Sequence, residues 1–122
     1  MKHAALALAL AAGLMATPAL AQPQDPVSQA NQRDMECAAL FAAIGGLQPE
    51  EAEGAAVGMT YYLGRLEGRN PGTNQVTQFF EWVSSMTEEE LAVMLDAAAP
   101  RCGEEMQTLG GSLMKAGSAL AG

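Results

Sequence analysis

The sequence predicts an all-α fold, a small bundle of four to five short helices stapled by one disulfide. Apolar residues recur at three- and four-residue intervals through most of residues 29–122, as in amphipathic helices, and no segment shows the alternation of a strand. Glycine and proline separate the apolar segments at distances typical of short helices. The two cysteines, Cys37 and Cys102, allow one intramolecular bridge.

The first helix is expected from about Gln29 to Ile44. Its apolar face has the spacing i, i+3, i+4, i+7 and consists of Cys37, Leu40, Phe41 and Ile44. The pair Gly45-Gly46 should end this helix, because glycine adopts the left-handed cap conformation at low cost.

The second helix is expected to begin at Pro49, since proline is favoured at the first helical position. Two glutamates follow at the positive end of the helix dipole. The expected core face is Ala52, Ala55, Met59, Leu63 and Leu66, with Tyr62 at its edge. The stretch 68–72 (Gly-Arg-Asn-Pro-Gly) is the strongest turn signal in the chain and should stop the helix.

The remaining helices follow this turn. One is expected from about Gln75 to Met86. The next begins with Thr87-Glu88-Glu89-Glu90, the pattern of a capping box, and Pro100 should end or kink it. A last helix has an apolar face of Cys102, Met106, Leu109 and Leu113. Its glycines weaken it, so we expect fraying after Leu113.

The N-terminus is typical of an export signal over residues 1–21. A positive start (Lys2 and His3) precedes a short apolar run, and the small residues Ala19-Leu20-Ala21 suit a signal peptidase, with cleavage after Ala21. The apolar run of about a dozen residues is shorter than the ~20 that span a bilayer, so a membrane anchor is the weaker interpretation. We therefore expect a periplasmic protein with a flexible leader at 22–28, one helical domain at 29–122 and no membrane span in the mature chain.

The mature chain is strongly acidic. All 14 acidic residues follow residue 21, against five basic ones, which leaves a net charge near −9. Binding to nucleic acid or anionic lipid needs a basic face, so neither partner is expected. The one histidine, His3, lies in the signal, which excludes histidine-based triads, dyads and metal sites from the mature protein.

An even cysteine count in an exported chain favours a structural disulfide between Cys37 and Cys102. The alternative, a redox-active thiol, is disfavoured because there is no C-x-x-C motif and no basic cluster near either cysteine in the sequence.

Catalysis has little support in the sequence. The run Glu88–Glu90 lacks calcium-loop spacing, and the scattered methionines lack copper-site clustering. Nucleophile-elbow, Walker and zincin motifs are absent. A carboxylate hydrolase using Glu67 and Glu81 is the weakest alternative. We expect no catalytic residue, no metal and no cofactor.

One side of the second helix is a candidate binding surface. On a helical wheel it gathers Gly54, Gly58, Tyr61, Arg65 and Arg69. The glycines would form a flat groove, bordered by an aromatic ring and two cations. Either another helix packs into this groove while the arginines meet local acids, or the groove takes a small anionic ligand or an acidic segment of a partner.

Three segments carry a resemblance to uncharacterised small exported proteins of Gram-negative bacteria: Cys37 in a first helix, Tyr61–Pro71, and Pro100-Arg101-Cys102. The resemblance covers most of the mature chain and implies the architecture without an activity. The single-disulfide helical layout is also loosely similar to periplasmic acid-stress chaperones and, more distantly, to secreted immunity proteins.

These observations predict a non-enzymatic periplasmic protein that acts by protein interaction, with a role in envelope stress implied by the looser resemblance. The partner would be an envelope protein. A small-ligand or anion-binding protein that uses the groove of the second helix is the alternative.

Overall fold

The computed structural model describes residues 26–122, and the predicted signal lies outside them. These residues form helices joined by short connections, without a strand. The elements are α1 (Pro26–Leu47), the 3₁₀ turn η1 (Pro49–Glu51), α2 (Ala52–Arg69), α3 (Gln75–Ser84) and α4 (Glu88–Ala121). The all-α prediction is confirmed, with four α-helices.

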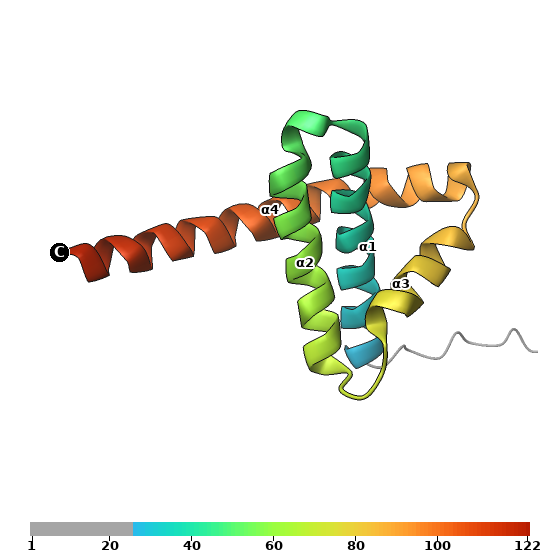
Figure 1. The fold of residues 1–122 in the computed structure, drawn as a ribbon, viewed down its shortest axis with the longest axis horizontal. Helices are drawn as coiled ribbons and strands as arrows, with labels where there is room; N and C mark the ends of the chain where they lie inside the picture. The colour runs from blue at the N-terminus through green and yellow to red at the C-terminus, as the bar shows by residue number, and fades with distance from the viewer. Residues whose placement is uncertain (1–25) are drawn as a thin grey trace, which may run out of the picture.

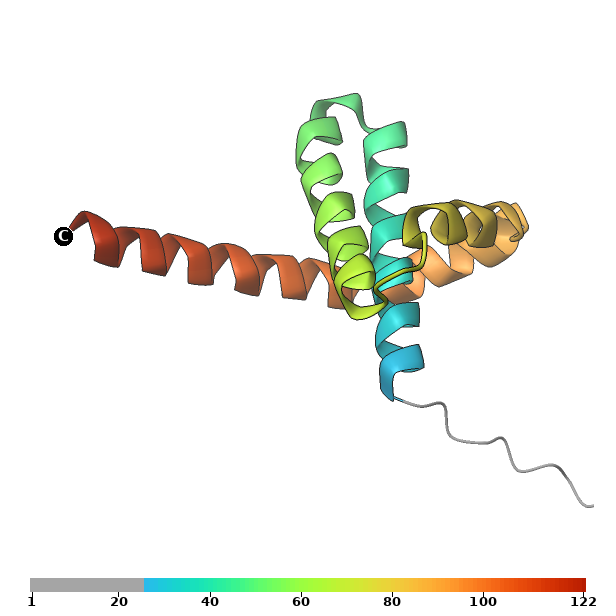
Figure 2. The ribbon, with the colours of Figure 1, turned by 60° about the horizontal axis from the view of Figure 1, so that its bottom comes forward.

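The helices cross in a simple arrangement. α1 and α2 form an antiparallel pair joined by η1, and α4 runs across this pair (Figure 1). α3 returns the chain from the end of α2 to the start of α4. The C-terminal part of α4 projects away from all the other helices (Figures 1 and 2).

The core lies where α1, α2 and α4 cross and is extended by Phe79 of α3. Its largest fully buried apolar side chains are Tyr62, Phe79 and Leu66. The ring of Phe41 stacks on that of Tyr62 with 6.0 Å between ring centres. Tyr62 therefore lies inside the core, and not at its edge as the helical wheel predicted.

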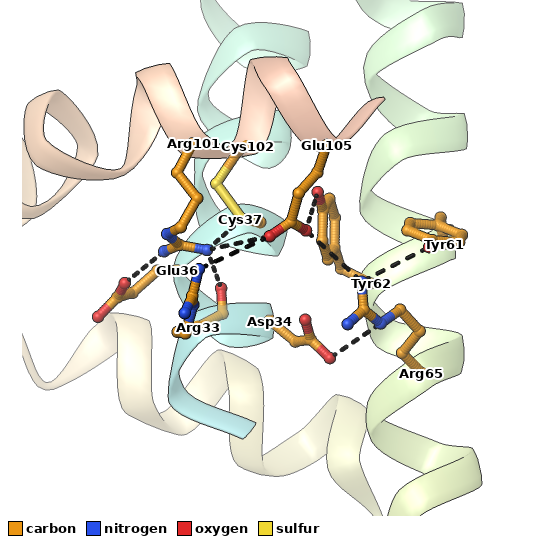
Figure 3. Close-up of a disulfide and its surroundings, with 10 residues drawn as sticks. All are labelled: Arg33, Asp34, Glu36, Cys37, Tyr61, Tyr62, Arg65, Arg101, Cys102 and Glu105. Atoms are coloured by element: carbon orange, nitrogen blue, oxygen red, sulfur yellow. Dashed lines mark hydrogen bonds and ion pairs between the residues drawn. A yellow bond between two sulfur atoms is a disulfide. The ribbon is translucent and has the colours of Figure 1, made fainter. Parts of the chain in front are cut away.

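The disulfide between Cys37 and Cys102 is confirmed. The two α-carbons are 5.5 Å apart, and both residues are fully buried. The bridge joins the middle of α1 to α4 at the crossing point, so it fixes the two helices at the centre of the core (Figure 3).

The predicted turn and capping signals are confirmed. Gly72 has a φ of 84°, which glycine adopts readily, and the Thr73 amide donates to the Asn70 carbonyl oxygen at 3.4 Å. Thr87 and Glu90 form a complete capping box at the start of α4. Both signals are local, which explains why the sequence sufficed to find them.

The ends of α1 differ from the prediction. α1 begins at Pro26, so 26–28 of the expected leader are helical, as proline at the first helical position allows. The helix continues through Gly45-Gly46 to Leu47. Gly45 serves a packing role instead of a cap, because a Cβ added there would lie 3.2 Å from Cβ of Ala55 on α2.

Pro100 does not end a helix. α4 runs through it for 34 residues, as far as Ala121, eight residues beyond the point where fraying was expected. Pro100 is exposed, and so is Asp96, whose carbonyl loses the helical hydrogen bond and can meet water. Ala98 and Cys102 are buried on either side, so packing and the disulfide hold the flanking turns in line.

Across residues 26–122, none of the helices combines the length and the apolar character needed to cross a membrane.

Candidate functional site

The two glycines of the predicted groove on α2 have different surroundings. Gly58 is buried, and a Cβ atom added there would lie 2.6 Å from the Phe41 ring of α1. Gly54 is exposed, and a Cβ added there would meet no atom within 4 Å. The structure thus fills one half of the groove with a neighbouring helix and leaves the other half open.

Asp34 of α1 forms ion pairs with both arginines of the predicted site. Its Oδ2 atom lies 3.3 Å from Nε of Arg65 and 2.6 Å from Nη2 of Arg69. Only 2% of Asp34 is exposed, and a buried carboxylate requires such compensation by charge and hydrogen bonds. The arginines therefore converge, but they converge on a carboxylate of their own chain.

A polar network continues from Arg69 to the ends of the two helices. Nη1 of Arg69 donates to Oδ1 of Asn31 at 2.8 Å, and the amides of Asn31 and Asn70 exchange hydrogen bonds of 2.9 and 3.1 Å. The Asn70 amide also donates to the Leu66 carbonyl oxygen at 2.8 Å. Arg69 is thus committed to holding α1 and α2 together.

Arg65 and the tyrosines form the next layer. The guanidinium carbon of Arg65 lies 5.5 Å from the Tyr61 ring centre and 5.7 Å from that of Tyr62, within cation–π range. The Tyr62 hydroxyl donates to Oε2 of Glu105 at 3.1 Å. Burial, followed by this hydrogen bond, raises the pKa of Tyr62 above its usual range. Tyr62 therefore stays a neutral donor that fixes Glu105.

Two arginines outside the predicted binding surface, Arg33 and Arg101, complete the cluster (Figure 3). Nη2 of Arg101 lies 2.8 Å from Oε2 of Glu36. Arg33 and Arg65 approach Glu105 at 3.9 and 3.5 Å. We call the whole group the arginine cluster; it contains Arg33, Arg65, Arg69, Arg101, Asp34, Glu36 and Glu105. Four cations face three carboxylates, so the cluster has a surplus of one positive charge in an acidic protein.

The sequence carried a signal for part of this cluster. Asp34 stands three residues before Cys37, on the face of α1 that the apolar spacing directs into the core. A charged residue on a core face requires a partner of opposite charge, and the arginines of α2 could have been proposed as the partners of Asp34. Glu105 carried no such signal, because its role depends on where α4 crosses α2.

A groove of about 500 Å³ opens beside the cluster, and we call it the arginine groove. Its walls come from α1, α2 and α4 and consist of Arg33, Tyr61, Arg65, Arg101, Glu104, Glu105, Thr108, Leu109 and Ser112. The predicted residues Tyr61 and Arg65 line it, whereas Gly54, Gly58 and Arg69 do not.

Glu67, one of the two acids considered for catalysis, forms hydrogen bonds within the fold. Oε1 of Glu67 accepts the backbone N–H of Gln75 at 2.9 Å, at the start of α3. Within residues 26–122, no group of three or more histidine, cysteine or acidic residues is placed to hold a metal ion. The arrangement gives no support to carboxylate chemistry at Glu67.

The projecting part of α4, residues 106–121, is the second feature, and we call it the arm (Figure 2). All residues from 111 to 121 are exposed. Leu113, Met114 and Leu120 are 64%, 77% and 90% exposed. Large apolar side chains at such exposure are unusual when they gather on one element.

The apolar face of the arm continues the face that packs into the bundle. Leu95, Ala98 and Cys102 of α4 belong to the core or contact it. At about 100° per residue, four residues of the arm lie within a sector of roughly 60° on one side of the helix. They form the arm seam, which is Leu109, Leu113, Ala116 and Leu120. Nothing in residues 26–122 covers the seam beyond Leu109.

Comparison with known proteins gives no relative: no family model, curated protein or solved structure matches the chain. The geometry therefore supplies the functional argument, and it offers a charged cluster already paired internally and an apolar seam without a partner.

Proposed function

We propose that the protein acts without catalysis, by binding another polypeptide through the arm seam, in the periplasm. The observation that carries this proposal is the exposure of Leu113 and Leu120 on a helix that leaves the bundle. The same helical face is apolar along its whole length, and only its first half is buried by the chain itself.

A partner would stabilise the arm as well as cover its apolar surface. Residues 111–121 of the arm are all exposed, and an isolated helix shorter than about 12–15 residues is marginal in water even when it is rich in alanine. The arm also contains Gly110, Gly111 and Gly117, each less favourable than alanine by about 1 kcal/mol in a helix interior. A partner that buries the seam would supply the missing stabilisation.

The anion-binding alternative has weaker support. A ligand at Arg65 would compete with Asp34, which is buried and already lies 3.3 Å away. Removing the arginines from Asp34 would leave an uncompensated carboxylate in the core, which is strongly unfavourable. A small anion would have to bind in the arginine groove without breaking this pair.

Two observations support a periplasmic location. Residues 1–21 have the pattern of an export signal, and disulfides persist in oxidising compartments such as the periplasm. The role in envelope stress belongs to the same proposal. It requires that acid increase the exposed apolar surface, which an environment-sensitive dye would detect between neutral pH and the carboxylate range near pH 4.

Photo-cross-linking in the periplasm tests the proposal. A benzophenone amino acid is placed at Leu113 or Leu120 in the seam and, as a control, at exposed Glu53 on α2. We expect protein adducts from the two seam positions and none from the control. If neither seam position gave an adduct in the folded, exported protein, the proposed function would be overturned.

A further inference from the structure

We infer that the arm seam binds a second copy of this chain, with the two arms antiparallel. This inference rests on the proposed function and names its partner. Three features of the molecule point to a second copy as the partner. They are the symmetric apolar spacing of the arm, the distribution of charge along the chain, and the position of the arginine groove.

The apolar spacing of the seam reads the same in both directions. Its members follow one another at intervals of four, three and four residues: Leu109, Leu113, Ala116 and Leu120. In an antiparallel pair, Leu109 lies opposite Leu120 of the second copy, and Leu113 lies opposite Ala116 of the second copy. Four layers result, two of leucine with leucine and two of leucine with alanine. Such self-complementarity is what a two-fold symmetric interface requires.

The projection of the arm leaves space for this pairing. The overlap spans residues 109–120, about 18 Å of helix, and from residue 111 onwards these residues are exposed on the part of α4 that projects from the bundle (Figures 1 and 2). In the antiparallel arrangement the two bundles lie at opposite ends of the paired arms. A parallel arrangement would instead bring two acidic bundles together at the same end.

The distribution of charge favours the arm over the bundle as the surface for self-association. All 14 acidic side chains lie at or before Glu105, and residues 106–122 carry only Lys115 as a charged side chain. Contact between two copies through the acidic bundle would join surfaces of like charge, which is unfavourable. Contact through the arms joins two surfaces that have almost no charge.

The end of the paired arm meets the arginine groove of the second copy. The last turn of α4 contains no basic residue, so its carbonyl groups and the negative end of the helix dipole lack a cation. Leu109 belongs both to the seam and to the groove. Because Leu109 pairs with Leu120, the helix end at Ala121 arrives beside this groove, where Arg33 is 58% exposed in its side chain.

The first experiment measures the mass of the purified, oxidised mature protein by light scattering from about 1 µM to 1 mM, a range that includes the Kd values of small interfaces. We expect the mass to rise towards that of a dimer. Leu113→Glu places a charge in the seam and should weaken dimerisation at least tenfold. Met114→Glu is the matched control, because Met114 is also exposed on the arm but points about 100° away from Leu113.

Both substitutions are on exposed positions, so helical content and melting temperature of the bundle report that each variant is folded. A wild-type protein that stays monomeric throughout the concentration range overturns the inference. Equal weakening by Leu113→Glu and Met114→Glu also overturns it, because the seam would then not be the contact.

A spin label at exposed Gln107 determines the direction of pairing. The antiparallel register separates the two labels by about 22 Å along the helix axis, whereas a parallel pair brings them to about 10 Å, the distance between packed helices. The shorter distance overturns the antiparallel arrangement.

The cross-linking experiment separates this inference from the proposed function. An adduct from Leu113 with twice the mass of the mature chain supports both. Adducts only with other proteins, together with a monomeric purified protein, keep the proposed function and overturn the second copy as partner. A monomer whose arm instead binds anionic lipid vesicles, without protein adducts, overturns both.

Discussion

Oδ2 of Asp34 lies 2.6 Å from Nη2 of Arg69, and this contact joins the first half of α1 to the last turn of α2. The η1 turn connects the two helices covalently at the other end of the pair. The ion pair therefore closes the end that has no connecting loop. Because Asp34 is buried, its charge is tolerable only while the arginines remain beside it.

Asp34→Asn should destabilise the fold by about 2–3 kcal/mol. The substitution keeps the volume of the side chain but leaves Arg65 and Arg69 without their shared carboxylate, and removal of a charged hydrogen-bond partner has about this cost. Urea unfolding would measure it. Glu53→Gln, an exposed position on α2, removes the same charge and should change stability by less than about 0.5 kcal/mol. Equal effects from the two variants would contradict a special role for Asp34.

Reduction of the Cys37–Cys102 disulfide should lower the free energy of unfolding by about 4 kcal/mol, because the bond closes a loop with a sequence separation of 65 residues. Thermal melts with and without a reductant would measure the loss. The native protein should show no reactive thiol. In the control, a Cys37→Ala and Cys102→Ala double variant should melt at the same temperature with and without reductant. Stoichiometric thiol labelling of the native protein would contradict the prediction.

The sequence was sufficient where structure depends on neighbours in the chain. The capping box at Thr87 and the turn at Gly72 are each determined by a few adjacent residues. Pro100 and Gly45 misled the prediction because their usual local effects were overridden by distant contacts. The disulfide at Cys102, two residues after Pro100, holds α4 in the core on both sides of the proline, and the close approach of Ala55 explains Gly45 within a helix.

The candidate site was predictable only in part for the same reason. A helical wheel places Tyr61 and Arg65 on one side of α2, and both do line one groove. The wheel contains no information about the residues that α1 and α4 contribute, so Asp34 and Glu105 were missed. The exposure of the arm depends on where the bundle ends along α4, which periodicity alone does not encode.

Gly54→Ala and Gly58→Ala should change stability in opposite directions. A methyl group at Gly58 would meet the Phe41 ring at 2.6 Å, and such overpacking costs about 1–3 kcal/mol, more than the helical preference of alanine returns. The methyl group at Gly54 meets nothing within 4 Å and should stabilise α2 by up to about 1 kcal/mol. Chemical denaturation of the two variants would measure both effects. Destabilisation by Gly54→Ala would indicate that another surface packs there.

Tyr62 should make the fold sensitive to alkaline pH. Burial and the hydrogen bond to Glu105 raise the pKa of Tyr62 above the usual value of 10.0, so the folded state favours the protonated phenol. The stabilisation is complete below the pKa of the unfolded chain and is lost as the pH rises above about 10 towards the folded pKa. Tyr62→Phe should lower stability at neutral pH by about 1 kcal/mol, through loss of the hydrogen bond, and should flatten the decline in stability at alkaline pH.

Tyr61→Phe is the matched control, because it keeps Tyr62 and should therefore keep the decline. Urea unfolding in buffers from about pH 8 to pH 11 would test this, and parallel curves for the wild type and Tyr62→Phe would contradict it.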